Sequence, residues 1–459
     1  MASGTVSGPA IEKSDAWSFV KRRLGLRGIG VVCALLALSG CDFFEAETTR
    51  IPGERISIML FQNTLEPDPR IADLQVRLPR PVRNIDWPQS GGNADHAMNH
   101  LELGAAIQEI WRADIGAGSS DTQRLLAQPI VAGDRIYAMD SESSVSAFNR
   151  ANGAHVWTID AKAPDDDDEA FGGGIAFEDG RLFVTTGFAQ IFSVDAQSGK
   201  ELWRKIVSGP MRAPPSVKNG RVFAITIDNQ LFAFDAKTGE KLWSHTGISE
   251  VAGLLGGASP AVSGGAVIAP YSSGEVYALR VESGRVIWSD NLTSSRRLDA
   301  LSSLADIRGM PVVDRGLVYA ISHSGRMVAI DLRTGGRAWE RGLGGVEMPW
   351  VAGEYIFVVT NRGELVCMTR RGGRIRWVQS LPRYEDDEEK DEPIKWSGPV
   401  LAGDRLVLVG SHGEAWSVSP YTGKPLGRVE LGDDVLISPI VADGTIYFLT
   451  EAGDLVAMR

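Results

Sequence analysis

The sequence predicts an all-β fold, an eight-bladed β-propeller preceded by a lipoprotein signal and a linker. Three observations lead to this fold class. A repeated pattern occurs eight times from about residue 111 onward, and seven of its copies contain a turn that ends in Gly. A strand before the first copy supplies the Trp that the last copy lacks. Units of about 45 residues, each with about four short strands, are typical of propeller blades.

The N-terminus has the features of an export signal. Basic residues from Lys21 to Arg27 precede a short apolar run, Ile29–Leu38, which is well below the ~20 residues that a permanent membrane span needs. The run ends in Leu38-Ser39-Gly40-Cys41, which resembles the bacterial lipobox. Residues 1–40 are therefore predicted to be an N-terminal extension and signal peptide, with Cys41 as the lipidated first residue of the mature chain. An ordinary export signal with an incidental Cys is the alternative.

The rest of the chain divides into a linker and a propeller. Residues 41–85 are rich in Pro, Arg and Glu, with one possible short helix near Arg70–Val76, and are predicted to be a lipid-anchored linker. Residues 86–459 are predicted to be the propeller of eight repeats.

Each repeat has two marks. A Gly stands just before an apolar run, as in Gly220-Arg-Val-Phe, and some 20 residues later a turn Gly is followed by Trp four residues on. Alternating apolar positions predict half-buried strands, and Asp or Asn before Thr-Gly or Ser-Gly predicts a turn that needs φ > 0 at Gly. The Trp residues are therefore predicted to pack between neighbouring units. They are Trp111, Trp157, Trp203, Trp243, Trp288, Trp339 and Trp377.

The ends of the repeat array predict how the ring closes. The last unit stops at Leu455–Arg459 and lacks its own turn and Trp, while residues 107–114 form a strand with no partner in the first unit. We expect this N-terminal strand to complete the last blade, because closure removes exposed sheet edges.

Composition excludes several classes of function. The chain has 47 basic and 58 acidic residues, a net charge of −11, and no basic stripe, which argues against nucleic-acid binding. Its three cysteines exclude a disulfide scaffold, a zinc ribbon and a Cys-ligated iron–sulfur cluster. No nucleophile elbow, zinc-protease motif or phosphate-binding loop is present.

The element Ala233–Trp243 resembles the tryptophan-docking repeat of quinoprotein propellers. Two families share that repeat: the pyrroloquinoline quinone (PQQ)-dependent alcohol dehydrogenases, and BamB, the lipoprotein subunit of the outer-membrane β-barrel assembly machine. A dehydrogenase of this kind is expected to contain an adjacent Cys pair, which is absent here. The resemblance to BamB covers the chain from the lipobox to Arg459. It implies a non-catalytic scaffold with no cofactor, and a quinoprotein oxidoreductase or a ligand-binding propeller unrelated to barrel assembly remain the alternatives.

The resemblance also implies partners and a location. The BamB family binds the periplasmic POTRA domains of BamA, works with the other assembly subunits and assists unfolded outer-membrane proteins. By resemblance, the chain is expected at the periplasmic face of the outer membrane, held by its lipid anchor. Asp42, directly after the lipidated Cys, resembles an inner-membrane retention signal and leaves that membrane as the alternative.

Two segments match the family's partner-binding loops. They supply the predicted partner-binding residues Leu254, Leu255, Leu301, Leu304, Asp306 and Arg308. The connection 294–308 is long and mixes charged residues with leucines, which suits a protein interface. The alternative is that these leucines only pack beneath their own loop.

Three further features have simpler interpretations. The acidic runs Asp165–Glu169 and Glu385–Glu392 lack the spacing of a calcium loop and are predicted to be solvated tips. Asp95-His96 and His100 lack a third ligand, so no metal site is predicted. Cys367 stands at a small-residue position of the repeat and is predicted to pack as a small hydrophobic residue.

Overall fold

The computed structural model describes residues 65–162, 170, 172–250, 253–293, 304–386 and 388–459, and all of these belong to one compact unit. Within these ranges the only helix is a short 3-10 helix, η1 (Pro69–Ile71), so the helix expected near Arg70–Val76 is shorter and begins earlier. Asp68 caps η1 by accepting a hydrogen bond from the Arg70 backbone N–H at 3.0 Å. Among the described residues no helix is long and apolar enough to cross a membrane.

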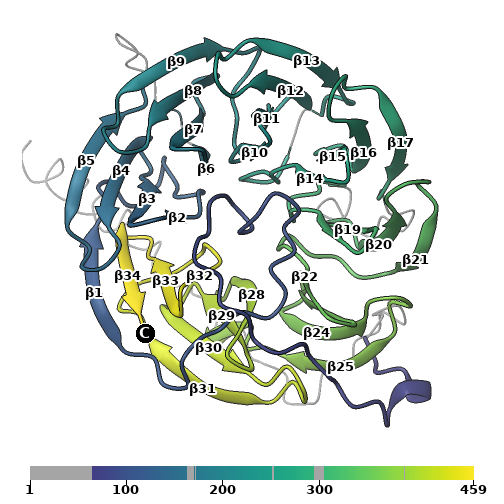
Figure 1. Cartoon of the computed structure of the whole chain (residues 1–459). Coiled ribbons are helices and arrows are strands. Elements are labelled where there is room, and N and C mark those ends of the chain that lie inside the picture. Colours follow the sequence, from purple (N-terminus) through teal and green to yellow (C-terminus); the bar gives the residue numbers. More distant parts are fainter. Residues whose placement is uncertain (1–64, 163–169, 171, 251–252, 294–303, 387) are drawn as a thin grey trace, which may run out of the picture. The chain divides into compact units, whose positions relative to one another are not determined.

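Eight four-stranded antiparallel sheets are arranged around a common centre (Figure 1). Sheet 1 contains β2 (Ile130–Ala132), β3 (Arg135–Met139), β4 (Ser144–Asn149) and β5 (His155–Asp160). Sheet 2 contains β6 (Gly173–Glu178), β7 (Arg181–Thr186), β8 (Gln190–Asp195) and β9 (Glu201–Ile206). Sheet 3 contains β10 (Ser216–Lys218), β11 (Arg221–Ile225), β12 (Gln230–Asp235) and β13 (Lys241–Thr246). Sheet 4 contains β14 (Ala261–Ser263), β15 (Ala266–Pro270), β16 (Glu275–Arg280) and β17 (Val286–Asn291).

The remaining sheets continue the same order around the ring. Sheet 5 contains β18 (Val312–Asp314), β19 (Leu317–Ser322), β20 (Arg326–Asp331) and β21 (Arg337–Arg341). Sheet 6 contains β22 (Trp350–Ala352), β23 (Tyr355–Val359), β24 (Glu364–Thr369) and β25 (Ile375–Ser380), and a small hairpin of β26 (Tyr384–Asp386) and β27 (Asp391–Pro393) follows it. Sheet 7 contains β28 (Trp396–Ala402), β29 (Arg405–Gly410), β30 (Glu414–Val418) and β31 (Pro425–Glu430). Sheet 8 contains β32 (Ile440–Ala442), β33 (Thr445–Leu449), β34 (Asp454–Met458) and β1 (Glu109–Asp114).

The ring closes as the sequence predicts. β1 pairs with β34, so the N-terminal strand becomes the outer strand of the sheet that the C-terminus builds. Trp111 lies opposite Ala457, the same register that places Trp243 opposite Ala233 in sheet 3. The eight-bladed propeller is therefore confirmed, with the two ends of the chain joined in one sheet.

The repeated Trp residues hydrogen-bond across the boundary between neighbouring sheets. In six of the seven, the indole N–H donates to a backbone carbonyl of the next sheet at 2.8–3.1 Å. The acceptors, in the order Trp111, Trp203, Trp243, Trp288, Trp339 and Trp377, are the carbonyls of Arg150, Ala236, Val281, Leu332, Arg370 and Pro420. The Trp157 indole N–H has no hydrogen-bond partner within the described residues, and the nearby Ala196 carbonyl accepts from Tyr137 instead.

Each turn Gly packs against the Trp of the preceding sheet. The seven glycines have φ between +58° and +76°, and a Cβ on any of them would lie 2.5–3.0 Å from a Trp side-chain atom. Only Gly satisfies both constraints, which explains why Gly and Trp recur together. The seven are Gly153, Gly199, Gly239, Gly284, Gly335, Gly373 and Gly423.

The up-and-down strand order gives the propeller two distinct faces. At one end of every sheet, which we call the loop face, the second strand turns into the third and the fourth strand leads to the next sheet. At the other end, the turn face, lie the tight turns between strands one and two and, in sheets 1 to 7, between strands three and four. In sheet 8 the third and fourth strands, β34 and β1, are not joined by a turn.

The centre of the ring contains a segment of the chain itself, residues 84–103, which we call the hub segment (Figure 1). It is irregular, yet it hydrogen-bonds to a residue in or directly beside the innermost strand of all eight sheets. Its partners, in the order β32, β2, β6, β10, β14, β18, β22 and β28, are Asp443, Val131, Phe177, Val217, Val262, Val313, Trp350 and Leu401. Trp87 of this segment is 1% exposed and stacks on Trp350, with 6.5 Å between the ring centroids.

Candidate functional site

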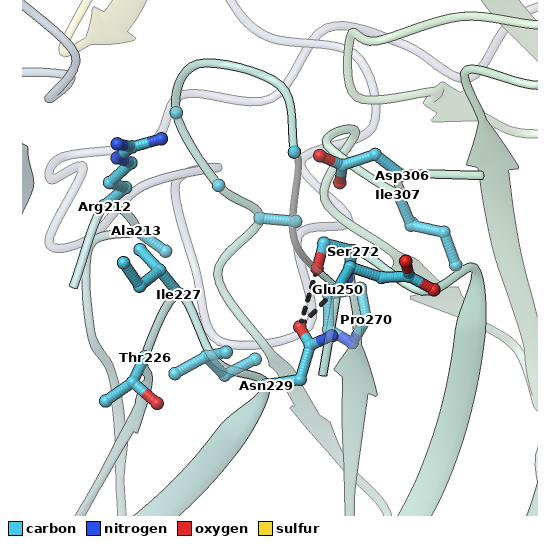
Figure 2. A pocket seen from close by; sticks show the side chains of 15 residues that line it. Arg212, Ala213, Thr226, Ile227, Asn229, Glu250, Pro270, Ser272, Asp306 and Ile307 are labelled. Atoms are coloured by element: carbon cyan, nitrogen blue, oxygen red, sulfur yellow. Dashed lines mark hydrogen bonds between the residues drawn. The ribbon is translucent and has the colours of Figure 1, made fainter. Parts of the chain in front are cut away.

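The loop face contains a cavity of about 170 Å³ beside sheets 3 and 4 (Figure 2). Five successive connections line it, those after β9, β11, β13, β15 and β17. Polar and charged side chains from these connections, including Arg212, Asn229, Glu250 and Asp306, surround an apolar floor that includes Ile225 and Ile307. The two segments predicted to bind a partner therefore meet at one cavity.

Asp306 joins these two segments. Its carboxylate accepts the Leu254 backbone N–H at 2.7 Å, and its own carbonyl accepts the His323 N–H at 2.9 Å. The side chain is only 7% exposed, and burial raises the pKa of its carboxyl, although the Leu254 N–H and the Arg308 charge act in the opposite direction. Asp306 thus holds the loops in place from inside.

Arg308 extends the site toward sheet 6. Its guanidinium lies 3.7 Å from the Glu347 carboxylate, and its Nε would be 3.0 Å from a Cβ at Gly256. Burial raises the pKa of Glu347 despite the opposing effect of Arg308. The ion pair therefore connects the loop after β17 to the connection after β21.

The predicted leucines differ in exposure. Leu255 is 42% exposed, whereas Leu254 and Leu304 are half-buried. Leu301 lies outside the described residues, as do Cys41 and Asp42 and the acidic run Asp165–Glu169. Leu255 is thus the predicted leucine that presents most apolar surface at this site.

Two further apolar residues, which the sequence did not single out, are exposed on the connections that form the cavity. Ile227 is 42% exposed and lines the cavity, and Ile248 is 59% exposed. We call Ile227, Ile248 and Leu255 the apolar rim. Ile227 stands where six of the other repeats place a polar residue and one places Gly187, and this departure was the signal that could have revealed it.

Asn229 fixes the geometry of the apolar rim. Its side-chain oxygen accepts the Ser272 backbone N–H and hydroxyl at 3.0 and 3.1 Å, as the dashed lines in Figure 2 show. Its amide N–H donates to the Ile248 carbonyl at 2.6 Å. One buried side chain therefore connects three of the cavity's connections.

Nearby, an aromatic cluster supports the same loops. The His245 and Tyr271 rings are stacked with 5.9 Å between their centroids, and His245 Nδ1 lies 2.9 Å from the Tyr271 hydroxyl. Tyr277 donates its hydroxyl to Glu275 at 3.0 Å, and Glu275 in turn accepts the Ile248 N–H at 2.9 Å. Burial lowers the pKa of His245, which keeps this ring neutral near pH 7.

The histidines of the hub segment bond to backbone atoms. His96 Nδ1 lies 2.7 Å from the Pro311 carbonyl, and burial lowers the pKa of His96 to about 4. His100 Nδ1 lies 2.8 Å from the Pro79 carbonyl, and its Nε2 accepts the Asp404 N–H at 3.0 Å. No group of three or more His, Cys, Asp or Glu side chains in the described part of the chain converges as metal ligands would.

Cys367 lies opposite Trp377 in sheet 6 and is fully buried, and burial raises the pKa of its thiol. The acidic run Glu385–Glu392 falls on the β26–β27 hairpin, where its described residues are exposed.

Comparison with known proteins gives one family. The family model described as "Outer membrane protein assembly factor BamB" matches residues 108–166 and 141–379. Among sequence relatives, BamB of Salmonella typhimurium is 28% identical over 356 residues, covering 76% of this chain and 88% of the relative. BamB of Escherichia coli is 27% identical over 355 residues, with the same coverage of both chains.

Solved structures give the same fold. The crystal structure of BamB from Moraxella catarrhalis matches with a TM-score of 0.66 at 18% identity, covering 77% of this chain and 100% of that one. A europium-containing methanol dehydrogenase matches with a TM-score of 0.63 at 14% identity, covering 82% of this chain and 98% of that enzyme. Both similarities concern the fold alone.

Proposed function

Because the chain belongs to the family of the outer membrane protein assembly factor BamB, we propose that it is a non-catalytic scaffold subunit of an outer membrane protein assembly complex. In this role it binds the periplasmic POTRA domains of BamA and assists the folding and insertion of outer membrane proteins. The lipid on Cys41 holds it at the periplasmic face of the outer membrane, with the inner membrane as the alternative that Asp42 leaves open.

The observation that carries this proposal is the apolar rim beside the loop-face cavity. Three exposed apolar side chains next to charged groups such as Arg212 and Glu250 are the composition of a protein-binding surface, in which a few apolar anchors supply most of the affinity. Asp306 and Asn229 hold the connections that carry these anchors. A surface that is rigid before binding loses little conformational entropy when a partner docks.

The absence of catalysis is part of the proposal. The similarity to methanol dehydrogenase is limited to the fold at 14% identity. The adjacent Cys pair expected of the quinoprotein dehydrogenases is missing from the sequence, whose three cysteines are Cys33, Cys41 and Cys367.

Binding to purified BamA POTRA domains tests the proposal. We expect Ile248→Asp combined with Leu255→Asp to weaken binding roughly tenfold or more, because each change places a charge where an apolar anchor must lose water. The matched control is Leu202→Asp with Leu426→Asp, which alters exposed leucines on the outer strands β9 and β31. Equal affinity of the rim variant and the control would refute the proposed surface.

A second pair of variants tests whether Asp306 holds its loop in place or contacts the partner directly. Asp306→Asn keeps an oxygen that can accept the Leu254 N–H and should bind almost as well as the unchanged protein. Asp306→Ala removes that acceptor, releases the loop and should weaken binding. If Asp306→Asn weakened binding as much as Asp306→Ala, the carboxylate would itself contact the partner.

A further inference from the structure

The turn face has a binding surface of different chemistry, formed by residues 74–85, which we call the arginine strip. The strip crosses the turn face from sheet 6 to sheet 8. At one end the Leu74 carbonyl accepts from Arg376 at 2.5 Å and the Gln75 carbonyl accepts from the Tyr355 hydroxyl at 2.9 Å. At the other end Asn84 bonds to the backbone of β32. The strip is therefore held at both ends.

The arginine strip combines positive charge with exposed apolar side chains. It contains Arg77, Arg80 and Arg83 and no acidic residue, in a chain whose net charge is −11. Arg83 pairs with Asp443, whereas Arg77 and Arg80 are exposed and form no ion pair within the described residues. Three apolar side chains of the strip are also exposed: Leu74 at 40%, Val82 at 64% and Ile85 at 64%.

The surroundings of the strip add further arginines. Arg371 and Arg374, in and just after the turn that precedes β25, are 79% and 43% exposed, although both lie near carboxylates. A cavity between the strip and sheet 6 is lined by Arg77 and Arg371 and by the acidic Asp73 and Glu354. The positive charge that is free of internal partners is therefore concentrated on Arg77 and Arg80.

The loop face is acidic by contrast. The β26–β27 hairpin presents exposed Glu385, Asp386 and Glu392, and Glu142 and Glu250 are exposed on other connections of the same face. An anionic surface would repel this face and attract the arginine strip.

We propose that the arginine strip rests on an anionic lipid surface, so that the turn face lies against the membrane and the loop face points away from it. Basic residues beside exposed apolar side chains suit the boundary between lipid headgroups and acyl chains. The inference extends the proposed function by giving the anchored protein an orientation, and it depends on lipidation at Cys41 but not on the identity of the partner.

The position of the anchor in the chain favours lipid over a soluble acidic partner. Only 23 residues, 42–64, lie between Cys41 and Leu65, the first described residue. A chain of that length spans at most about 85 Å, so a lipidated protein stays tethered within that reach of a bilayer, which raises the effective concentration of lipid at its surface. In this orientation the apolar rim, which lies on the opposite face, is available to a periplasmic partner.

Fluorescence quenching on reconstituted lipoprotein tests the orientation. The full lipidated protein is labelled at Ile85→Cys on the strip or at Ile227→Cys on the loop face, and buried Cys367 is not accessible to the label. It is then placed in phosphatidylcholine vesicles with or without phosphatidylglycerol, with a quencher attached to the headgroups. We expect at least threefold stronger quenching at position 85 than at position 227 when phosphatidylglycerol is present, and a loss of the difference at high salt.

Charge variants identify the groups responsible. Arg77→Glu with Arg80→Glu should abolish the phosphatidylglycerol-dependent quenching at position 85. The control Lys205→Glu with Arg383→Glu changes the net charge equally at exposed positions outside the strip and should leave it intact. Circular dichroism confirms that each variant is folded.

Two outcomes would overturn the proposal: equal quenching at the two positions, or quenching at position 85 that does not depend on phosphatidylglycerol. The first result is the one expected if the strip binds an acidic protein instead of lipid, because the vesicles contain no such partner. Measuring POTRA binding of the two charge variants, without the label at position 227, keeps this test separate from the proposed function, since neither charge variant changes the apolar rim.

Discussion

The contact between each turn Gly and the preceding Trp predicts a large difference between two glycines of the same sheet. Gly335 and Gly316 have similar backbone angles, with φ of +74° and +80°. A Cβ at Gly335 would lie 2.6 Å from Cβ and Cγ of Trp288, whereas a Cβ at Gly316 would have nothing within 4 Å. Replacing each by Ala therefore separates the backbone cost from the packing cost.

The expected magnitudes follow from these contacts. At Gly316, Ala has room for its Cβ and must only adopt the left-handed conformation, which lowers the free energy of unfolding by about 1–2 kcal/mol. Ala also makes the unfolded chain stiffer than Gly does, which returns about 0.4–1 kcal/mol. At Gly335, Ala must also displace Trp288 atoms close to the backbone, which cannot swing away, and such overpacking adds about 1–3 kcal/mol. Gly316→Ala should thus cost about 1 kcal/mol and Gly335→Ala about 2–4 kcal/mol.

Urea unfolding of the two variants measures the difference. The free energies of unfolding of the two variants can be compared only if both fall with urea concentration at the same slope. A different slope would mean that a variant exposes a different amount of surface on unfolding. Losses that agree within about 0.5 kcal/mol would refute the reasoning, because the cost would then come from φ alone and the Trp–Gly contact would not constrain the repeat.

Two further predictions concern the closure of the ring and its hub. Trp111→Ala should lower the free energy of unfolding by about 3–5 kcal/mol, because this ring fills the contact between sheets 8 and 1; a loss below about 1 kcal/mol in urea unfolding would contradict that role. His96, whose folded pKa of about 4 lies below the usual histidine value of 6.5, predicts lower stability on acidification, since the unfolded chain takes up the proton first. His96→Gln should remove up to about 3 kcal/mol of the stability lost between pH 6.5 and pH 4, and an unchanged pH profile would show that His96 does not titrate in this way.

The repeat itself was predictable because its marks are local. The turn Gly, the small residue and the Trp lie within 11 residues of one another, as in Ala233–Trp243, so one strand–turn–strand unit reveals the register of a whole sheet. The closing strand was predictable for the same reason, since it carries the Trp that the last unit lacks.

The hub segment and the apolar rim were not predictable in this way. The hub segment has no hydrophobic period, and its hydrogen bonds reach residues up to some 360 positions away, as from Asn84 to Asp443. At the candidate site, the sequence located the two loops but not the role of Asp306, whose acceptor position for Leu254 depends on how the connections after β13 and β17 fold against each other. Ile227 stands on the connection after β11, which the sequence did not single out, and Ile248 lies on the connection after β13 but outside the segment that supplied Leu254 and Leu255.

The path of the hub segment has a consequence for biogenesis. Residues 84–103 leave the ribosome before any of the eight sheets can form, yet their hydrogen-bond partners extend to Asp443 near the C-terminus. The hydrogen bonds of this early segment therefore cannot all form until synthesis of the chain is almost complete. A truncation that removes only β32–β34 leaves Asn84 without its partners Val441 and Asp443.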